Sequence, residues 1–142
     1  MRNISIENFM SSHGISMRLM KMKTGQRRGE GNEMVEDYRC RIERFGQQID
    51  VHVRVPSDDG GPSASDVFFL LILDASGCEM LKEYHGRRNE FKKMISGSGA
   101  AHDEFDEFWL EYESRRRQSL LLKGFLGGRL YETMIERFGF AN

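Results

Sequence analysis

Residues 38–55 read Y-R-C-R-I-E-R-F-G-Q-Q-I-D-V-H-V-R-V, and this stretch decides the fold. Apolar residues occupy every second position on both sides of a Gly46-Gln47 break. A period of two on either side of a two-residue Gly-X turn is typical of a β-hairpin. With Gly46-Gln47 as the turn, Ile42 is expected to face Val51, and all the apolar partners then lie on one face of the hairpin.

The polar residues of the same hairpin define its solvent-facing side. The expected register places Arg39 near Arg54 and Arg41 near His52. Like charges directly opposite each other destabilise a sheet slightly, a cost that is tolerated where the face meets a partner. The alternative is that flexible, solvated side chains simply spread apart, because such surface pairs cost little.

The length and composition indicate one globular domain over residues 1–142. Hydrophobic residues make up 39% and charged residues 30%, a balance typical of soluble globular proteins. The mean hydropathy of −0.57 is on the polar side, so a partner or a second copy in a homodimer is expected to cover leftover apolar surface. The 21 basic and 22 acidic residues nearly cancel, which does not favour a nucleic-acid binder.

Cysteine content and hydropathy indicate a cellular compartment. Cys40 and Cys78 are too few for a disulfide framework, which favours a reducing environment. The longest apolar run, Val67–Leu73, is far shorter than the roughly 20 residues that span a bilayer. The N-terminal residues lack the apolar region of a secretory signal. We therefore expect a cytoplasmic protein that does not associate with membranes.

The segments around the hairpin complete the N-terminal half. Residues 15–23 alternate imperfectly and are expected to form a third strand, although their methionines also favour a helix. Residues 1–14 are expected to be flexible or to form a short leading element. The Gly-containing segments 24–32 and 56–63 are expected to be loops.

The run Val67–Leu73 fits either a buried helix or a buried strand, because seven apolar residues carry no decisive period. Ser63 followed by Asp66 resembles a capping box, which favours a helix that begins there. Gly77 is then expected to cap the C-terminus of this helix.

The C-terminal half is expected to be helical. The segment Glu79–Ile95 has helical spacing with a break near His85-Gly86, and residues 96–102 form a flexible break. Asp103–Lys123 is expected to be the longest helix, with acidic residues in its first turn and a stripe of aromatic residues along it. A last amphipathic helix follows and ends at Gly139.

These elements define an α+β fold. Strands at about 15–23, 35–45 and 48–55 come first, and the helices follow them. We expect a three-stranded antiparallel sheet, formed by the N-terminal half, that packs against three or four C-terminal helices.

No catalytic or metal-binding motif is evident. The four histidines lack the spacing of metal ligands, and the glycines match no phosphate-binding pattern. Cys78 and His85 would lie about 10 Å apart on one helix, beyond hydrogen-bond reach. We therefore expect no enzyme activity, no cofactor and no bound metal.

Charge is segregated locally along the chain. Basic residues cluster within 82–93 and at 115–117, whereas acidic residues crowd 103–113. An acidic helix can mimic phosphates in the groove of a host protein, and the basic clusters can contact nucleic acid directly. The candidate partner-binding residues are Arg39, Arg41, Arg54, Arg87, Arg88, Asp103, Glu104, Asp106 and Glu107.

Four stretches carry a resemblance to a known group of proteins. They are Tyr38-Arg39-Cys40, Ala64-Ser65-Asp66-Val67 continuing through Asp74-Ala75, Glu107-Phe108-Trp109, and Leu122-Lys123-Gly124-Phe125-Leu126-Gly127. Through them the region 35–135 resembles small uncharacterised proteins of bacteriophages and prophages, from which the Gly-rich insertions of this chain depart.

The resemblance implies an accessory protein of a phage or mobile element that acts by binding a host protein or nucleoprotein complex. By analogy, such a protein inhibits host defence, as an anti-CRISPR or anti-restriction factor. The alternative is a small nucleic-acid-binding protein. A third alternative is a nuclease-like enzyme, in which His52 or His85 would act with Arg87 and Arg88, residue types that suit phosphodiester cleavage.

Overall fold

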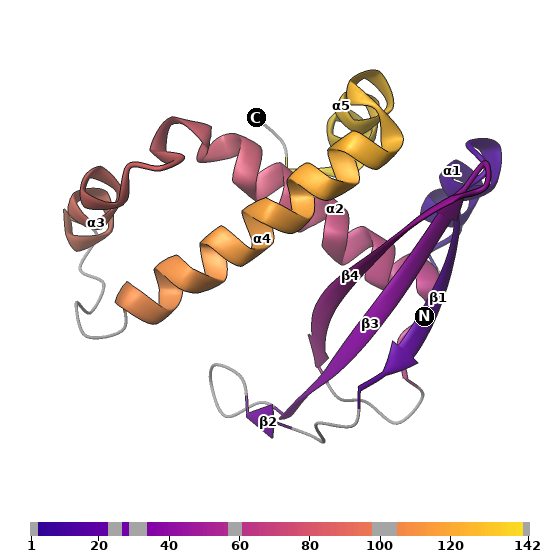
Figure 1. The fold of residues 1–142 in the computed structure, drawn as a ribbon, viewed down its shortest axis with the longest axis horizontal. Helices are drawn as coiled ribbons and strands as arrows, with labels where there is room; N and C mark the ends of the chain where they lie inside the picture. Colours follow the sequence, from indigo (N-terminus) through magenta and orange to yellow (C-terminus); the bar gives the residue numbers. More distant parts are fainter. Residues whose placement is uncertain (1–2, 23–26, 29–33, 57–60, 98–104, 141–142) are drawn as a thin grey trace.

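The computed structural model describes residues 3–22, 27–28, 34–56, 61–97 and 105–140. In chain order the elements are α1 (Ile4–Ser12), β1 (Ser16–Lys21), β2 (Arg27–Arg28), β3 (Met34–Arg44), β4 (Gln47–Pro56), α2 (Ala64–Met80), the 3₁₀ turn η2 (Lys82–Tyr84), α3 (Arg88–Gly97), α4 (Phe105–Leu126) and α5 (Gly128–Phe138) (Figure 1). The strands come before the large helices, which confirms the predicted α+β class.

One antiparallel sheet holds the described strands, with β3 at its centre. β4 pairs with one edge of β3, whereas β1 and the two-residue β2 pair with the other edge. The three long strands confirm the predicted sheet, and β2 is a short addition to it. Most of the predicted loop 24–32, part of the predicted loop 56–63 and most of the predicted break 96–102 lie outside the described residues.

The hairpin turn is Phe45-Gly46 rather than the predicted Gly46-Gln47. Both turn residues have positive φ, +51° at Phe45 and +79° at Gly46, as a type I′ turn requires. Ile42 consequently faces Ile49 and not Val51. The predicted register was wrong by two residues. Because side chains alternate with a period of two, the same residues still point inward.

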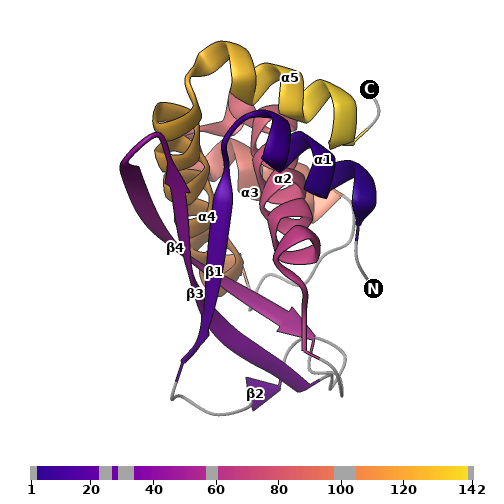
Figure 2. The same cartoon turned by 90° about the vertical axis from the view of Figure 1, so that its right-hand side faces the viewer.

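The main core lies between the inward face of the sheet and the helices α1, α2 and α5 with the C-terminal half of α4 (Figure 2). Cys40, Ile42 and Val51 enter it from the sheet, and Phe68 and Ile72 enter it from α2. Each of these five side chains is at most 1% exposed. The alternating pattern of the hairpin therefore determines which face the helices cover.

The ambiguous run Val67–Leu73 is helical and forms the middle of α2. Its predicted N-cap is confirmed, because Ser63 Oγ accepts a hydrogen bond of 3.2 Å from the Asp66 backbone N–H. Both faces of α2 carry buried residues, since the helix contacts α1, α4, α5 and the sheet. This wide burial explains why the sequence shows no single apolar stripe there.

The predicted C-cap of this helix was wrong. α2 continues through Gly77 to Met80, and Leu81 is the residue that caps it. The Phe140 backbone N–H donates a 2.9 Å hydrogen bond to Ser76 Oγ, so this turn of the helix is joined to the C-terminal segment. That tertiary contact favours helical backbone where glycine alone favours a stop.

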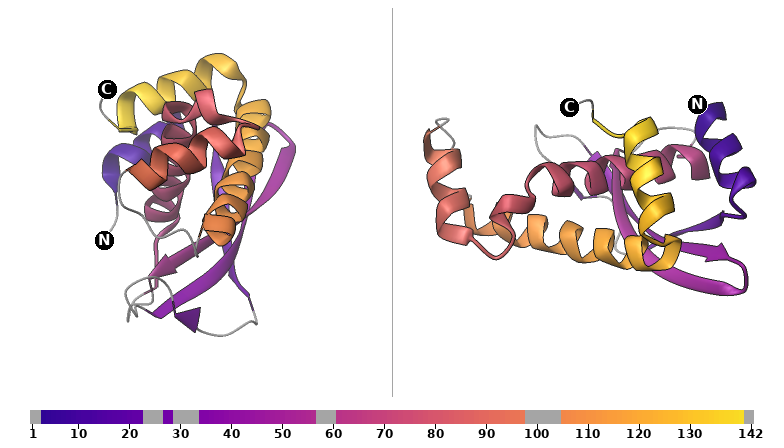
Figure 3. Two further views of the ribbon diagram at one scale, coloured as in Figure 1. Left: turned by 90° about the vertical axis from the view of Figure 1, so that its left-hand side faces the viewer. Right: turned by 90° about the horizontal axis from the view of Figure 1, so that it is seen from above.

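A second hydrophobic cluster, which we call the aromatic arm, consists of α3, η2 and the N-terminal half of α4. The arm projects from the side of the molecule opposite the sheet (Figure 1, Figure 3). Phe91 of α3 is 1% exposed and lies at its centre. The rings around it at centroid distances of 5.3–6.2 Å are Tyr84, Phe105, Phe108, Trp109 and Tyr112.

Glycines mark two of the breaks between helices. Gly86 has φ of +71° and separates η2 from α3, which confirms the expected interruption near His85-Gly86. Gly127 has φ of +88° and separates α4 from α5. Both values lie in the left-handed region, where glycine has no steric penalty.

Candidate functional site

The helices that the structure describes pack against one side of the sheet, and the other side is the candidate site (Figure 2). We call it the outer sheet face. Its side chains come from alternate positions of three strands, so each is held by the backbone ladder at a fixed place. They are Arg18 and Met20 of β1; Asp37, Arg39, Arg41 and Glu43 of β3; and Gln48, Asp50, His52 and Arg54 of β4.

The charges of the hairpin pair with opposite signs across this face. Arg41 Nε and Nη2 contact the two carboxylate oxygens of Asp50 at 3.1 and 3.5 Å. Arg54 Nε lies 3.5 Å from Asp37 Oδ1. The predicted like-charge contacts of Arg39 with Arg54 and of Arg41 with His52 were wrong, because the register differs by two residues. The hairpin therefore carries matched ion pairs at these positions, while Arg18 of β1 still lies opposite Arg41 of β3.

Two arginines of the outer sheet face keep their charge available to a partner. Arg39 lies opposite His52, and its guanidinium contacts the Met20 sulfur at 3.6 Å. Arg18 lies opposite Arg41 across the β1–β3 pairing. Within the described residues, neither Arg18 nor Arg39 forms an ion pair with a carboxylate. These two side chains can therefore bind an external anion without breaking an internal ion pair.

The Arg41–Asp50 pair predicts a pH dependence of stability. The pKa of Asp50 lies below its ordinary value because the Arg41 side chain hydrogen-bonds to its carboxylate, with Coulombic help from Arg41, Arg39 and His52. A lowered folded-state pKa stabilises the fold above the unfolded value of about 3.9, and this contribution is lost as the pH falls through the folded pKa. We expect Asp50→Asn to flatten the acid limb of the stability profile, as measured by urea unfolding between about pH 2 and pH 6. Glu107→Gln is the control, because it removes a carboxylate of the aromatic arm that forms no ion pair within the described residues. An acid limb that Asp50→Asn leaves unchanged would contradict the prediction.

The edge of the sheet next to this face is covered by α4. Gln118 Nε2 donates a 2.9 Å hydrogen bond to the His52 carbonyl, and the His52 N–H donates to Gln118 Oε1. The side-chain amide thus replaces a neighbouring peptide group at the free edge of β4. Arg54 also reaches α4, where Glu111 Oε2 lies 3.9 Å from its Nη1. These contacts hold β4 in place against the helical layer.

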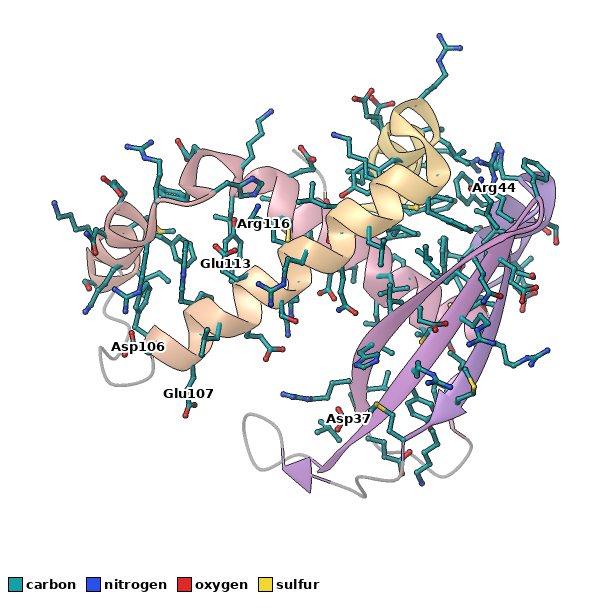
Figure 4. The ribbon with its side chains drawn as sticks, in the orientation of Figure 1. Asp37, Arg44, Asp106, Glu107, Glu113 and Arg116 are labelled. Atoms are coloured by element: carbon teal, nitrogen blue, oxygen red, sulfur yellow. The ribbon has the colours of Figure 1, made fainter. Side chains whose placement is uncertain are left out.

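The remaining predicted partner-binding residues lie elsewhere. Arg87, Arg88, Asp106 and Glu107 belong to the aromatic arm, and Figure 4 shows Asp106 and Glu107 at the start of α4, away from β3. Arg88 forms an ion pair with Asp106 and lies 4.9 Å from the centre of the Phe105 ring. Asp103 and Glu104 lie outside the described residues. The structure therefore does not bring the nine predicted residues together on one surface.

The Cys78–His85 region forms no nucleophile–base pair. His85 Nε2 lies 3.2 Å from the Cys78 backbone carbonyl, whereas the contact of the Cys78 thiol is Ser119 Oγ at 4.0 Å. Burial raises the pKa of the Cys78 thiol, and it raises the pKa of Cys40 to about 12. Neither thiol is therefore activated as a nucleophile near neutral pH.

Of the outer sheet face, the sequence named only Arg39, Arg41 and Arg54 as candidate partner-binding residues. Arg18 on the face and Gln118 at its edge were missed for two different reasons. Arg18 alternates with Met17 and Leu19, both of which point inward, so the strand pattern of 15–23 carried the signal that places Arg18 outward. Gln118 had no such signal, because its role depends on how α4 crosses the edge of β4. The outward position of Arg18 could have been predicted from the alternation of its strand, whereas the role of Gln118 could be found only from the tertiary arrangement.

Comparisons of this chain with protein-family models, with curated proteins and with solved structures found no match. Among the residues that the structure describes, no group of three or more His, Cys, Asp or Glu side chains could hold a metal ion. None of the described helices has the length and apolar character needed to cross a membrane. The role of the chain must therefore be inferred from the outer sheet face itself.

Proposed function

We propose that this chain is a non-enzymatic binding protein that docks its outer sheet face on a protein of a host cell. The observation that supports this most directly is the open face of three strands, on which charges of both signs stand at fixed positions. Such patterned charge contributes selectivity and association rate, because a wrong partner places like charges together. The expected partner surface is polar and carries carboxylates opposite Arg18 and Arg39.

The balance of charge favours a protein partner over nucleic acid. Asp37 and Asp50 neutralise Arg54 and Arg41, and Glu43 adds a further negative charge to the face. A surface that follows a phosphate backbone usually presents an excess of cations. A mixed surface of this kind is better matched to the equally mixed surface of a protein or of the protein part of a nucleoprotein complex.

The proposed setting is a phage or other mobile element, whose accessory protein binds and inhibits a host defence complex in the cytoplasm. The resemblance of residues 35–135 to small phage and prophage proteins supports this setting. Inhibition by occupying a surface requires no catalytic group, in keeping with the buried Cys40 and Cys78 thiols of raised pKa.

The test is a pull-down from nuclease-treated host lysate with the intact chain and two charge-reversal variants. Arg18→Glu/Arg39→Glu changes the outer sheet face without breaking an internal ion pair, so the fold should be retained, as checked by circular dichroism. We expect the captured partner to be lost or to bind about tenfold more weakly. Arg87→Glu/Lys93→Glu on the aromatic arm is the matched control and should bind as the unchanged chain does.

Two results would contradict this proposal. One is partner capture that depends on the arm variant and is indifferent to the sheet variant. The other is capture that disappears whenever nucleic acid is digested, since a protein partner persists under that treatment.

A second candidate function is direct nucleic-acid binding, and one observation favours it. Arg18 lies across from Arg41 and Arg39 lies across from His52, so four basic groups adjoin on neighbouring strands. Fluorescence anisotropy with single-stranded and duplex DNA and RNA distinguishes this candidate. Binding that falls linearly on a log–log plot against salt, and that Arg18→Glu/Arg39→Glu removes, would support it over the protein partner.

A further inference from the structure

The tip of the hairpin presents an aromatic residue that the fold does not bury. Phe45 is 78% exposed and occupies the first position of the type I′ turn with φ of +51°. That position favours Asn, Asp or Gly, and a bulky side chain there is strained. Its ring contacts the Arg44 guanidinium at 4.6 Å and lies against Gly14, where a Cβ would come within 2.8 Å of Phe45 Cε1. The ring thus touches Arg44 and Gly14 while most of its surface stays in water.

An open apolar hollow lies beside this tip. It has a volume of about 480 Å³ and lies between the start of β4 and the C-terminal half of α4. Ile49, Leu120, Leu121 and Phe125 supply its apolar lining, and Leu120 and Leu121 are 52% and 45% exposed. Gly124 also lines it, and nothing lies within 4 Å of the place where its Cβ would be, so the helix surface is open to close approach. An open surface with this apolar lining can receive an aromatic side chain.

The exposed ring and the hollow are neighbours on one surface. Gln47 and Gln48 follow directly after the turn and also line the hollow. A two-fold axis that passes near these two residues would place Phe45 of each copy over the hollow of the other copy. An interface of this kind is isologous, because the same patch supplies the projecting group and the recess. Gln47 and Gln48 can hydrogen-bond to their copies across this axis, since each side-chain amide both donates and accepts hydrogen bonds.

Charged residues beside the turn and beside the hollow have opposite signs, which suits the same two-fold arrangement. Glu43 is exposed beside the turn, and Arg117 is exposed on α4 one turn before Leu120 and Leu121. Within the described part of the chain neither forms an ion pair. When the ring of one copy enters the hollow of the other, Glu43 of the first copy approaches Arg117 of the second. Opposite charges at this place favour a second copy over other occupants.

We infer that the chain forms a two-fold dimer in which Phe45 of each copy fills the hollow between β4 and α4 of the other. The interface is small and rests on one aromatic anchor per copy, so the dissociation constant is expected in the micromolar range. Phe45→Asn tests it, because asparagine is preferred at this turn position and removes the anchor ring together with its contacts to Arg44 and Gly14.

Sedimentation velocity over a dilution series up to about 0.5 mM is the measurement, because mass action makes a weak dimer depend on concentration. The unchanged chain should shift from monomer to dimer. Phe45→Asn should remain monomeric with a melting temperature no lower than that of the unchanged chain. Leu110→Asn is the matched control, since Leu110 is 69% exposed on α4 outside the hollow, and it should dimerise normally.

The charge contact provides a second, independent readout. Glu43→Arg and Arg117→Glu should each weaken the dimer by about tenfold, and the double reversal should recover most of that loss. A chain that stays monomeric at the highest concentration would overturn the inference. So would a Phe45→Asn variant that dimerises as strongly as the unchanged chain, or a double reversal that is as weak as the single changes combined.

Discussion

Replacing Phe68 with alanine is expected to lower the free energy of unfolding by about 3–5 kcal/mol. Phe68 is fully buried on α2, and it belongs to the core that joins this helix to the inward face of the sheet. The variant loses the transfer free energy of the ring and retains a cavity that the surrounding helices cannot fully close. Because a domain of this size is stable by only about 5–15 kcal/mol, a large part of its stability would be lost.

Urea unfolding followed by far-ultraviolet circular dichroism measures this loss. Phe140→Ala is the matched control, since that ring is 49% exposed at the end of the chain, and the change should cost about 1 kcal/mol or less. Equal losses for the two alanine variants would show that Phe68 does not occupy the centre of the core.

Phe91→Ala is expected to open the aromatic arm and to leave the sheet folded. The Phe91 ring is 1% exposed and contacts rings from η2 and α4, so truncation should cost about 3–5 kcal/mol. Phe91 is absent from the main core cluster, so the loss falls on the contacts that hold α3 against α4. Regions with few links to the main core open separately from it.

Amide hydrogen exchange tests this local effect. Protection should fall in α3 and in the first turns of α4, whereas the amides of β3 and β4 should exchange as slowly as before. Met94→Ala, which changes a 40% exposed side chain of the same helix, should leave both regions protected. A uniform loss of protection across the sheet and the arm would contradict the independence of the arm.

The arm and the outer sheet face can therefore be varied separately. Phe91→Ala should reduce the order of the arm without weakening a partner that binds at Arg18 and Arg39, because those residues belong to the sheet. This separation makes charge reversal on the arm a suitable control for charge reversal on the sheet.

The hairpin shows how much of the fold followed from local pattern. Period-two alternation over 38–55 identified both strands and their inward face, which are as predicted. The turn was misplaced because Phe45 adopts positive φ, a conformation that the residue type disfavours and that pattern rules therefore assign elsewhere. The observed register differs from the predicted one by two residues. It therefore forms the ion pairs Arg41–Asp50 and Arg54–Asp37, where the predicted register placed like charges opposite each other.

The candidate site was only partly accessible to the same reasoning. Arg39, Arg41 and Arg54 were placed correctly on the solvent side, because alternation decides which face a strand residue joins. Arg87, Arg88, Asp106 and Glu107 were grouped with them by charge alone, and charge carries no information on where a helix lies relative to a sheet. In the structure these four residues lie on the aromatic arm and not on the sheet.

The amino-acid sequence by itself determined the class of this fold, the inward face of its hairpin, the start of α2 and the breaks near Gly86 and Gly127. These properties depend on neighbouring residues, on caps such as Ser63 and on glycines such as Gly86 and Gly127, whose effects are local. Only the tertiary structure decided that α2 continues past Gly77, that Gln118 closes the edge of β4 and that Phe45 stands beside an apolar hollow. Each of these depends on contacts between residues far apart in the chain, and no local pattern encodes them.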